Sequence, residues 1–432
     1  MQKIAFHTLG CKLNFSETAT LSRLFVTEGF EKTVFNKKAD VYVINTCSVT
    51  GTADKKCKAA IRKATRLNPE ATVIVTGCYA QLKPKEIVNI PGVSLVLGAN
   101  EKLNLDKYLE QINNRKAPEV HSCEISEVDN FFSAYSLNER TRSFLKVQDG
   151  CDYPCTYCTI PKARGKSRNG TIAQIIEEAE DIAAHAVKEI ILTGVNIGDF
   201  GKSTNETFFE LIQALDKVEG IERIRISSIE PNLLTDEIIK YVANSKKIMP
   251  HFHIPLQSGS DHILKTMKRR YNSNLFRQKV ELINKLMPHA AIGVDVIVGF
   301  PSESDTHFEE AKTFINSLDI MNLHVFTYSE RSGTPAVDIK PIVPIKKRQE
   351  RSRQFHVLSD KKQRYFNERF LNTERSALIE IMNSNGIMYG FTDNYIKIEL
   401  PFDKDIQNQI VKVRLDSVLE NGNMKASLIK KL

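Results

Sequence analysis

Apolar residues in the first 112 positions follow two alternating patterns. Short apolar runs of strand length are separated by segments in which apolar residues recur every three to four positions, as on one face of a helix. We expect strands at 4–9, 40–45, 72–76 and 93–98, and helices at 16–28, 52–67, after Pro84 and at 103–112. Ser16 is the expected cap of the first helix. This alternation predicts an N-terminal domain over residues 1–112 with a doubly wound parallel sheet.

A second run of alternating strands and helices follows an irregular stretch at 113–138, which we interpret as a linker. Strands are expected at 144–148, 189–195, 223–229, 251–256, 292–300 and 323–328, with helices between them. Six strand–helix units are two fewer than a closed eight-stranded barrel contains. Residues 139–367 are therefore predicted to form a partial barrel, which makes the chain an α/β multidomain protein.

The C-terminal residues 368–432 have a different pattern. Short apolar segments at 376–381, 388–392, 395–400, 410–419 and 427–429 are separated by turn-forming sequences rich in Asn and Gly. Short strands at this spacing predict a small β-barrel domain. Small five-stranded barrels often bind nucleic acid, although a purely structural appendage would have the same pattern.

Charge and composition narrow the class of protein. Hydrophobic residues make up 41% and charged residues 26% of the 432 positions, as in ordinary globular proteins. No apolar run approaches about 18 residues, and the first residues are expected to form a strand rather than a secretory leader, so we expect a cytoplasmic protein without membrane contact. The whole chain has a net charge of +8. Positions 340–375 alone contain eleven Lys and Arg but only four Asp and Glu. This basic segment predicts either a polyanionic partner or a solvated helix face.

Three cysteines lie close together at Cys151, Cys155 and Cys158, with Tyr157 just before the last. Three thiolates can hold a four-iron cluster and leave one iron open for another ligand. A zinc site would need a fourth Cys or His nearby, a ferredoxin cluster needs four thiolates, and a disulfide is uncommon in the cytosol. The spacing and the aromatic residue resemble those of the radical S-adenosylmethionine (SAM) enzymes, in which the open iron binds SAM.

Three further cysteines each follow an expected strand of the N-terminal domain: Cys11, Cys47 and Cys78. In a parallel sheet the carboxyl ends of all strands meet at one edge, where ligands bind. We therefore expect these thiols to meet and to hold a second three-thiolate cluster, rather than to be three separate buried residues. Cys57 lies on the apolar face of its expected helix and Cys123 lies in the linker, so neither is expected to be a ligand.

Polar residues and glycines stand at the carboxyl ends of the expected barrel strands and predict a SAM pocket there. Glycine allows a cofactor to approach the backbone closely. The predicted cofactor-binding residues are Tyr157, Gly194, Asn196, Ser228, Glu230 and Gln257. Glu230 has helix capping as its alternative role. The basic residues after the three-cysteine motif are interpreted either as phosphate contacts beside the reacting nucleotide or as a solvated loop; they are Lys162, Arg164, Lys166 and Arg168.

Taken together, the two sets of three cysteines, the partial barrel and the C-terminal β-barrel resemble the methylthiotransferases, a radical SAM family whose last domain is of the TRAM type. The sequences at 8–14, 147–151, 227–231 and 324–329 are similar to the threonylcarbamoyladenosine tRNA branch. The resemblance implies SAM and two [4Fe–4S] clusters, with all six cysteines as catalytic ligands. It implies insertion of sulfur and a methyl group at carbon 2 of N6-threonylcarbamoyladenosine at tRNA position 37, next to the anticodon.

The same resemblance implies a set of partners. They are the anticodon stem-loop of tRNA, an electron donor such as flavodoxin or ferredoxin, and a sulfur donor of unknown identity, with the enzyme acting as a monomer. Two related reactions are the alternatives: methylthiolation of isopentenyladenosine in tRNA and methylthiolation of an aspartate in a ribosomal protein. A third alternative is a non-enzymatic iron–sulfur protein that binds RNA.

Overall fold

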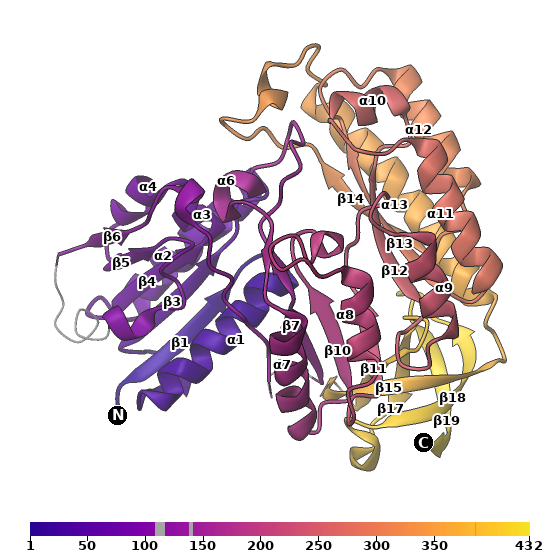
Figure 1. The fold of residues 1–432 in the computed structure, drawn as a ribbon, viewed down its shortest axis with the longest axis horizontal. Coiled ribbons are helices and arrows are strands. Elements are labelled where there is room, and N and C mark those ends of the chain that lie inside the picture. The colour runs from indigo at the N-terminus through magenta and orange to yellow at the C-terminus, as the bar shows by residue number, and fades with distance from the viewer. Residues whose placement is uncertain (109–116, 138–140, 385) are drawn as a thin grey trace.

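The chain folds into three successive units in a computed structural model, which describes residues 1–432 except 109–116, 138–140 and 385 (Figure 1). A parallel α/β unit at the N-terminus is followed by a six-stranded open barrel and then by a small closed β-barrel. The open barrel lies between the other two units (Figure 1). The predicted fold class is confirmed.

The N-terminal unit is a six-stranded parallel sheet. Its strands, in spatial order, are β2 (Glu31–Thr33), β1 (Lys3–Thr8), β3 (Val41–Thr46), β4 (Thr72–Gly77), β5 (Leu95–Leu97) and β6 (Glu119–His121). The connecting segments contain α1 (Lys12–Thr27), α2 (Gly51–Leu67), α3 (Cys78–Leu82), α4 (Pro84–Val88) and the 3-10 turn η1 (Leu105–Tyr108). The sequence pattern missed β2 and β6, because edge strands of three residues are too short to show a period. β6 extends the sheet into the segment interpreted as a linker.

The first helix begins earlier than expected. α1 starts at Lys12 with Cys11 at its N-cap position, whereas Ser16 lies inside the helix and its hydroxyl donates to Leu13 O. The expected cap at Ser16 is therefore wrong. Gly10, at a φ of 104°, makes the turn from strand to helix and leaves Cys11 at the sheet edge. A helix was expected at 103–112. Within this range the structure has the 3-10 turn η1, and residues 109–112 lie outside the described ranges.

The central unit is an open barrel made of two three-stranded parallel sheets. One contains β7 (Arg142–Lys146), β10 (Glu189–Thr193) and β11 (Arg223–Ile226), and the other contains β12 (His251–Gln257), β13 (Ala291–Val298) and β14 (Asn322–Thr327). Single parallel bridges, Ile224 to Ile248 and Ser228 to His253, join the two sheets. The intervening helices are α6 (Ile160–Arg164), α7 (Ile172–Ala184), α8 (Phe208–Leu215), α9 (Asp236–Asn244), α10 (Asp261–Thr266), α11 (Ser273–Leu286) and α12 (Asp305–Ser317). β7 and β14 are the outer strands, so the barrel is open between them.

The C-terminal unit follows α13 (Ile345–Glu368) and is a closed five-stranded barrel. Its strands pair in the order β15 (Glu374–Ser384), β16 (Ile387–Thr392), β17 (Lys397–Pro401), β19 (Met424–Lys431) and β18 (Ile410–Val418). The expected small barrel is confirmed, with a fifth strand longer than the sequence pattern indicated. Among the described helices, none is both long and apolar enough to cross a membrane.

Two buried arginines of β11 attach this small barrel to the amino ends of the open-barrel strands. Arg225 donates to Glu189 Oε1 at 2.8 Å and to Thr392 O at 2.7 Å. Arg223 donates to Ser376 Oγ at 2.6 Å. The small barrel therefore lies at the end of the strands opposite to their carboxyl ends, which leaves the mouth of the open barrel to the cysteine-bearing loops.

Candidate active site

The three cysteines of the N-terminal unit line one cavity of about 390 Å³ at the contact with the open barrel. Cys11 precedes α1, Cys47 follows β3 and Cys78 begins α3, so all three stand at the carboxyl edge of the sheet. Gly77 has a φ of 95°, and a Cβ there would lie 2.4 Å from Thr46 O. Glycine permits this close approach, which places Cys78 beside the strand that leads to Cys47.

Burial disfavours ionisation of these thiols, and a nearby arginine favours it. Burial raises the pKa of Cys47 to about 11, and it also raises the pKa of Cys11. The charge of the Cys78 thiolate raises both values further, whereas the Arg164 guanidinium lowers both. A positively charged group bound among the three thiols would offset the remaining penalty, as it does in metal sites built from thiolates.

Arg164 belongs to a buried ionic cluster between the N-terminal unit and the open barrel. Its Nη1 lies 3.0 Å from Glu17 Oε1 and 2.8 Å from Asp149 Oδ1, and both carboxylates are buried. Three further cations pair with the same two carboxylates at 2.5 to 3.3 Å: Lys102, Lys146 and Arg168. Four cations thus surround two carboxylates, and the excess positive charge lies beside the thiol of Cys78.

This cluster corrects one expectation about the basic residues after Cys158. The prediction of a phosphate contact or a solvated loop is wrong for Arg164 and Arg168, because both side chains are buried and their guanidinium groups bind carboxylates. Lys162 is exposed and donates to Gly333 O, and Lys166 is also exposed. Lys162 and Lys166 are therefore the members of this group that lie at the surface.

The other three cysteines lie in the loop between β8 (Gln148–Asp149) and α6. Each sulfur accepts an N–H donor: Tyr153 N lies 3.4 Å from Cys151 Sγ, Ile160 N lies 3.4 Å from Cys158 Sγ, and Arg269 Nη1 lies 3.1 Å from Cys155 Sγ. Burial raises the pKa of Cys151 and of Cys158 to about 12. N–H donors directed at three thiols suit sulfurs that carry negative charge as cluster ligands.

Arg269 connects Glu230 to this loop and was missed by sequence reasoning. Its Nη2 pairs with the Glu230 carboxylate, and its Nη1 donates to Cys155 Sγ. The Glu230 side chain therefore pairs with an arginine, and its backbone oxygen is the group that accepts from the turn at Leu233. The one signal in the sequence is the basic run of Lys268, Arg269 and Arg270, which by itself indicates only a charged surface.

The remaining predicted cofactor residues divide into two groups. Tyr157, Gly194 and Gln257 line the same cavity as the N-terminal cysteines. Gln257 has a φ of 65°, and its buried Oε1 has no hydrogen-bond partner among the described residues. Such backbone strain in a non-glycine residue is typical of functional sites. Asn196 and Ser228 lie outside the cavity lining, where Asn196 donates to Asp199 and Ser228 bridges to β12.

Two comparisons with known sequences bear on this geometry. Residues 3–98 match the family described as Uncharacterized protein family UPF0004, and residues 145–315 match the Radical SAM superfamily. The chain is 40% identical to the threonylcarbamoyladenosine tRNA methylthiotransferase MtaB of Bacillus subtilis (strain 168), over 96% of this chain and 94% of that relative. The chain belongs to the methylthiotransferase family.

Other relatives place this methylthiotransferase within a wider group. It is 35% identical to the tRNA-2-methylthio-N(6)-dimethylallyladenosine synthase of Sulfurihydrogenibium sp. (strain YO3AOP1), over 78% of this chain and 79% of that relative. It shares its fold with the radical SAM methyltransferase TsrM from Kitasatospora setae, with a TM-score of 0.56, 14% identity, and 75% of this chain and 73% of that chain covered. Membership in the radical SAM superfamily implies SAM and a [4Fe–4S] cluster as cofactors.

In this methylthiotransferase, loops of the open barrel bind the N-terminal unit beside the cysteines. Arg331, in the loop after β14, lies 2.6 Å from Ser48 Oγ and 2.8 Å from Asp54 Oδ2. Thr159, next to Cys158, donates to Ser48 O at 3.4 Å. Ser48 directly follows Cys47, so these contacts hold the two cysteine-bearing loops against each other.

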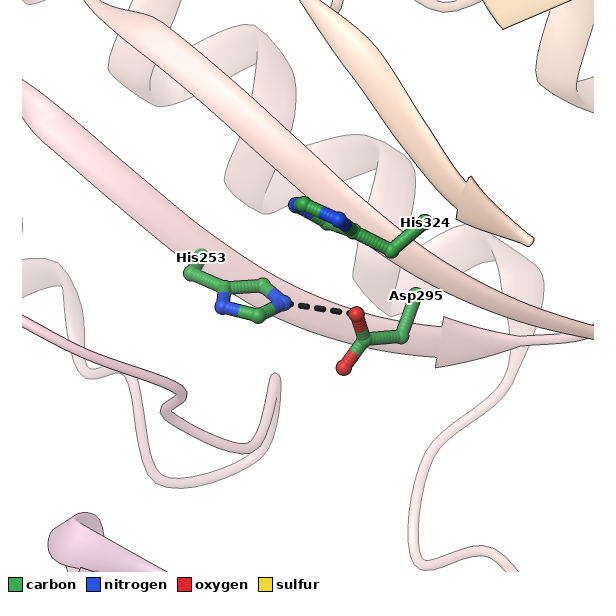
Figure 2. A group of neighbouring side chains, drawn as sticks. All are labelled: His253, Asp295 and His324. Carbon is green, nitrogen blue, oxygen red and sulfur yellow. Dashed lines mark hydrogen bonds and ion pairs between the residues drawn. The ribbon is translucent and has the colours of Figure 1, made fainter. Parts of the chain in front are cut away.

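Three polar side chains of the barrel wall were also missed by sequence reasoning. Figure 2 shows His253, Asp295 and His324 side by side on three neighbouring strands, with His253 Nε2 2.7 Å from Asp295 Oδ1. Asp295 lines the cavity that the N-terminal cysteines share. The available signal was the position of Asp295 in an otherwise apolar strand, because a buried strand rarely carries a carboxylate without a specific role.

Proposed function

We propose that this methylthiotransferase acts on tRNA and converts N6-threonylcarbamoyladenosine next to the anticodon into its 2-methylthio derivative. The observation that carries the proposal is that the N-terminal set of three thiols lines a cavity whose wall also includes Tyr157, from the loop that carries the other three cysteines. The identity of 40% with a threonylcarbamoyladenosine tRNA methylthiotransferase over nearly the whole chain supports this substrate. Carbon 2 of adenine carries an unactivated C–H bond, which requires radical chemistry of the kind that SAM cofactors supply.

The two thiol sets fit two [4Fe–4S] clusters, each with one open iron. Cys151, Cys155 and Cys158 would hold the cluster that cleaves SAM, and Cys11, Cys47 and Cys78 would hold the second. When bound, the first cluster together with SAM would supply a hydrogen-abstracting radical, and the second cluster would hold the sulfur to be inserted. The excess positive charge of the ionic cluster around Arg164 suits the negative charge that three thiolates bring.

The surrounding residues orient and enclose the reactants. Arg269 donates to Cys155 Sγ, and the Tyr157 ring packs edge-on against Phe300 with 6.1 Å between centroids. Gly194 has no side chain and leaves space in the cavity wall, while the free Oε1 of Gln257 offers an acceptor for SAM or the target base. Glu230 would act on SAM through Arg269, with which it pairs, and Asn196 and Ser228 stay predicted SAM contacts outside the lining of this cavity.

The tRNA partner requires a path for the base and a surface for the backbone. The adenosine must leave the anticodon-loop stack to reach an enclosed site. Within α13, Arg348 and Arg351 are buried and pair with Glu330 and Glu303, so these two charges do not face RNA. The exposed cations of this helix that would bind phosphates include Lys346, Arg353 and Lys361. A flavodoxin or ferredoxin would supply electrons, and we expect the enzyme to act as a monomer.

The test is a nucleoside profile by mass spectrometry of tRNA from a deletion strain. We expect the 2-methylthio derivative of threonylcarbamoyladenosine to disappear, with its unmodified precursor increased, and plasmid-borne protein to restore it. Loss of the 2-methylthio derivative of isopentenyladenosine (dimethylallyladenosine) instead would indicate that this nucleoside is the substrate. An unchanged profile with a lost ribosomal-protein modification would assign the protein substrate. Failure of the reduced, reconstituted protein to form 5′-deoxyadenosine from SAM would favour an RNA-binding regulator.

We expect Arg269→Met to lower the reduction potential of the SAM-cleaving cluster. Hydrogen bonds to cluster sulfurs are one of the factors that set this potential, and the donor at 3.1 Å from Cys155 Sγ would be lost. A redox titration followed by electron paramagnetic resonance measures the shift, and 5′-deoxyadenosine formation should slow with the same reductant. Arg270→Met is the matched control, because its guanidinium lies over the Tyr153 ring at 4.1 Å. Equal potentials in both variants would contradict the assigned contact.

A further inference from the structure

The open barrel presents a group of polar side chains to the cavity in which the N-terminal cysteines lie. Asp295 on β13 pairs in register with His324 on β14, and His253 on β12 contacts the Asp295 carboxylate at 2.7 Å (Figure 2). The rings of His253 and His324 are 5.0 Å apart. Asp295 itself lines the cavity, together with Gln257 from the end of β12. The proposed reaction at the cysteines assigns no task to the two histidines or to Asp295.

Lys12 adds a positive charge to this group from the N-terminal unit. It follows Cys11, is half-buried, and makes no ion pair with any carboxylate in the part of the chain that the structure describes. Its charge also acts on Tyr395 of the small C-terminal barrel: burial raises the pKa of Tyr395, yet Lys12, Arg142 and Arg225 bring it below its ordinary value. Burial lowers the pKa of His324, and the charges of His253 and Lys12 lower it further. At His324 burial is the largest cause and the Asp295 carboxylate opposes the positive charges, whereas Lys12 adds a positive charge at both sites.

The wall also leaves space beside His324. Gly293 stands two residues before Asp295 and so on the same face of β13. A Cβ at this position would lie 3.6 Å from His324 Nε2, so any larger side chain would occupy the space in front of that ring. Gly293 thereby leaves the imidazole of His324 accessible from within the barrel.

We propose that Lys12 and His324 bind the carboxylate of the threonylcarbamoyl group, and that Asp295, held by His253, accepts a hydrogen bond from the N–H or hydroxyl of the same group. The proposal rests on the proposed function and specifies how the substrate is selected. A dimethylallyl group offers none of these partners and would leave the half-buried ammonium of Lys12 without an anion to bind, which is a basis for rejection.

The same three side chains would also suit a divalent cation by distance, since their ligand atoms lie within 4.8 Å of one another. The placement of Lys12 decides against it. A metal ion would meet the ammonium charge of Lys12, which also lowers the pKa of His324, and the group offers one carboxylate, Asp295, to offset its charge. An organic anion with hydrogen-bond donors of its own is complementary to the whole group.

The experiment measures binding of two anticodon stem-loop RNAs to the full-length, cluster-loaded protein by fluorescence anisotropy. One RNA carries N6-threonylcarbamoyladenosine, and the other carries its carboxamide, which has the same shape without the charge. We expect the native protein to bind the acid about tenfold more tightly, as for a hydrogen-bonded charged group. Lys12→Gln and His324→Gln should each remove most of this preference while binding of the carboxamide changes less than about twofold.

Lys38→Gln, which removes an exposed lysine of the same unit, is the matched control and should keep the preference. The proposal would be overturned if the native protein bound the two RNAs with equal affinity. It would also be overturned if Lys12→Gln lowered the affinity for both RNAs by the same factor. The methylthiolated product, measured in the same samples, separates this proposal from the proposed function. If the native protein prefers the acid RNA but forms no methylthiolated product, the carboxylate site is supported and the proposed reaction is contradicted. If product forms but the two RNAs bind equally, the reaction is supported and the carboxylate site is contradicted.

Discussion

Replacement of Cys78 by alanine is expected to block methylthiolation of tRNA while SAM cleavage continues. The variant loses one ligand of the N-terminal thiol set, and the loop with Cys151, Cys155 and Cys158 lies on another structural unit with its own N–H donors. Iron should fall from about eight to about four atoms per chain, because each cluster contains four. Iron analysis, 5′-deoxyadenosine formation and nucleoside mass spectrometry measure the three quantities on one reconstituted sample.

Cys155→Ala should have the opposite effect on SAM, with 5′-deoxyadenosine lost together with the modified nucleoside. Cys57→Ala is the matched control, because Cys57 is fully buried on α2 and its thiol donates to Cys47 O at 3.4 Å. It lies next to the proposed site without lining the cavity, so iron content and both activities should be retained. Equal loss of both activities in Cys78→Ala would contradict separate roles for the two thiol sets.

The fold and the placement of the cysteines were predictable because both depend on local patterns. The apolar run of β3 and the periodic apolar positions of α2 are each visible within a short window, and Cys47 lies directly between them. Once the strands are known to be parallel, chain order alone brings Cys11, Cys47 and Cys78 to one edge. The same reasoning located the loop of Cys151 at the mouth of the barrel.

The parts that escaped prediction depend on partners distant in the sequence. Arg164 meets Glu17 from 147 positions away, and Arg269 meets Cys155 from 114 positions away. No periodic pattern encodes such pairs, so Arg164 was interpreted either as a phosphate contact or as part of a solvated loop, and Arg269 was not considered. The error at Ser16 has a different cause: a serine in a helical pattern resembles a cap, whereas the tight turn at Gly10 starts the helix one turn earlier.

Arg164→Met is expected to destabilise the contact between the N-terminal unit and the open barrel more than any other single change at this interface. Arg164 donates to two buried carboxylates, Glu17 and Asp149, and also to Asn14 Oδ1 at 2.6 Å. Removing one partner of a buried ion pair costs about 3–5 kcal/mol, which for a protein of this size lowers Tm by roughly 3–6 °C. Differential scanning fluorimetry of the anaerobic, iron-loaded protein measures the change. Lys166→Gln, at an exposed position two residues away, should leave Tm unchanged within about 1 °C.

The pH dependence of this loss distinguishes an electrostatic cause from a packing defect. Burial alone would raise the pKa values of Glu17 and Asp149, yet Arg164 and the neighbouring lysines hold both below the ordinary carboxyl range. The native cluster therefore contributes its full stability above about pH 5 and loses it as the pH falls through those lowered values. Without Arg164 the two pKa values rise, while Lys102, Lys146 and Arg168 still pair with the carboxylates, so the variant has less electrostatic stability to lose when they are protonated. The difference in Tm between native protein and variant should accordingly stay constant from pH 8 to about pH 5 and narrow as the pH falls further, whereas a packing defect would leave it constant throughout.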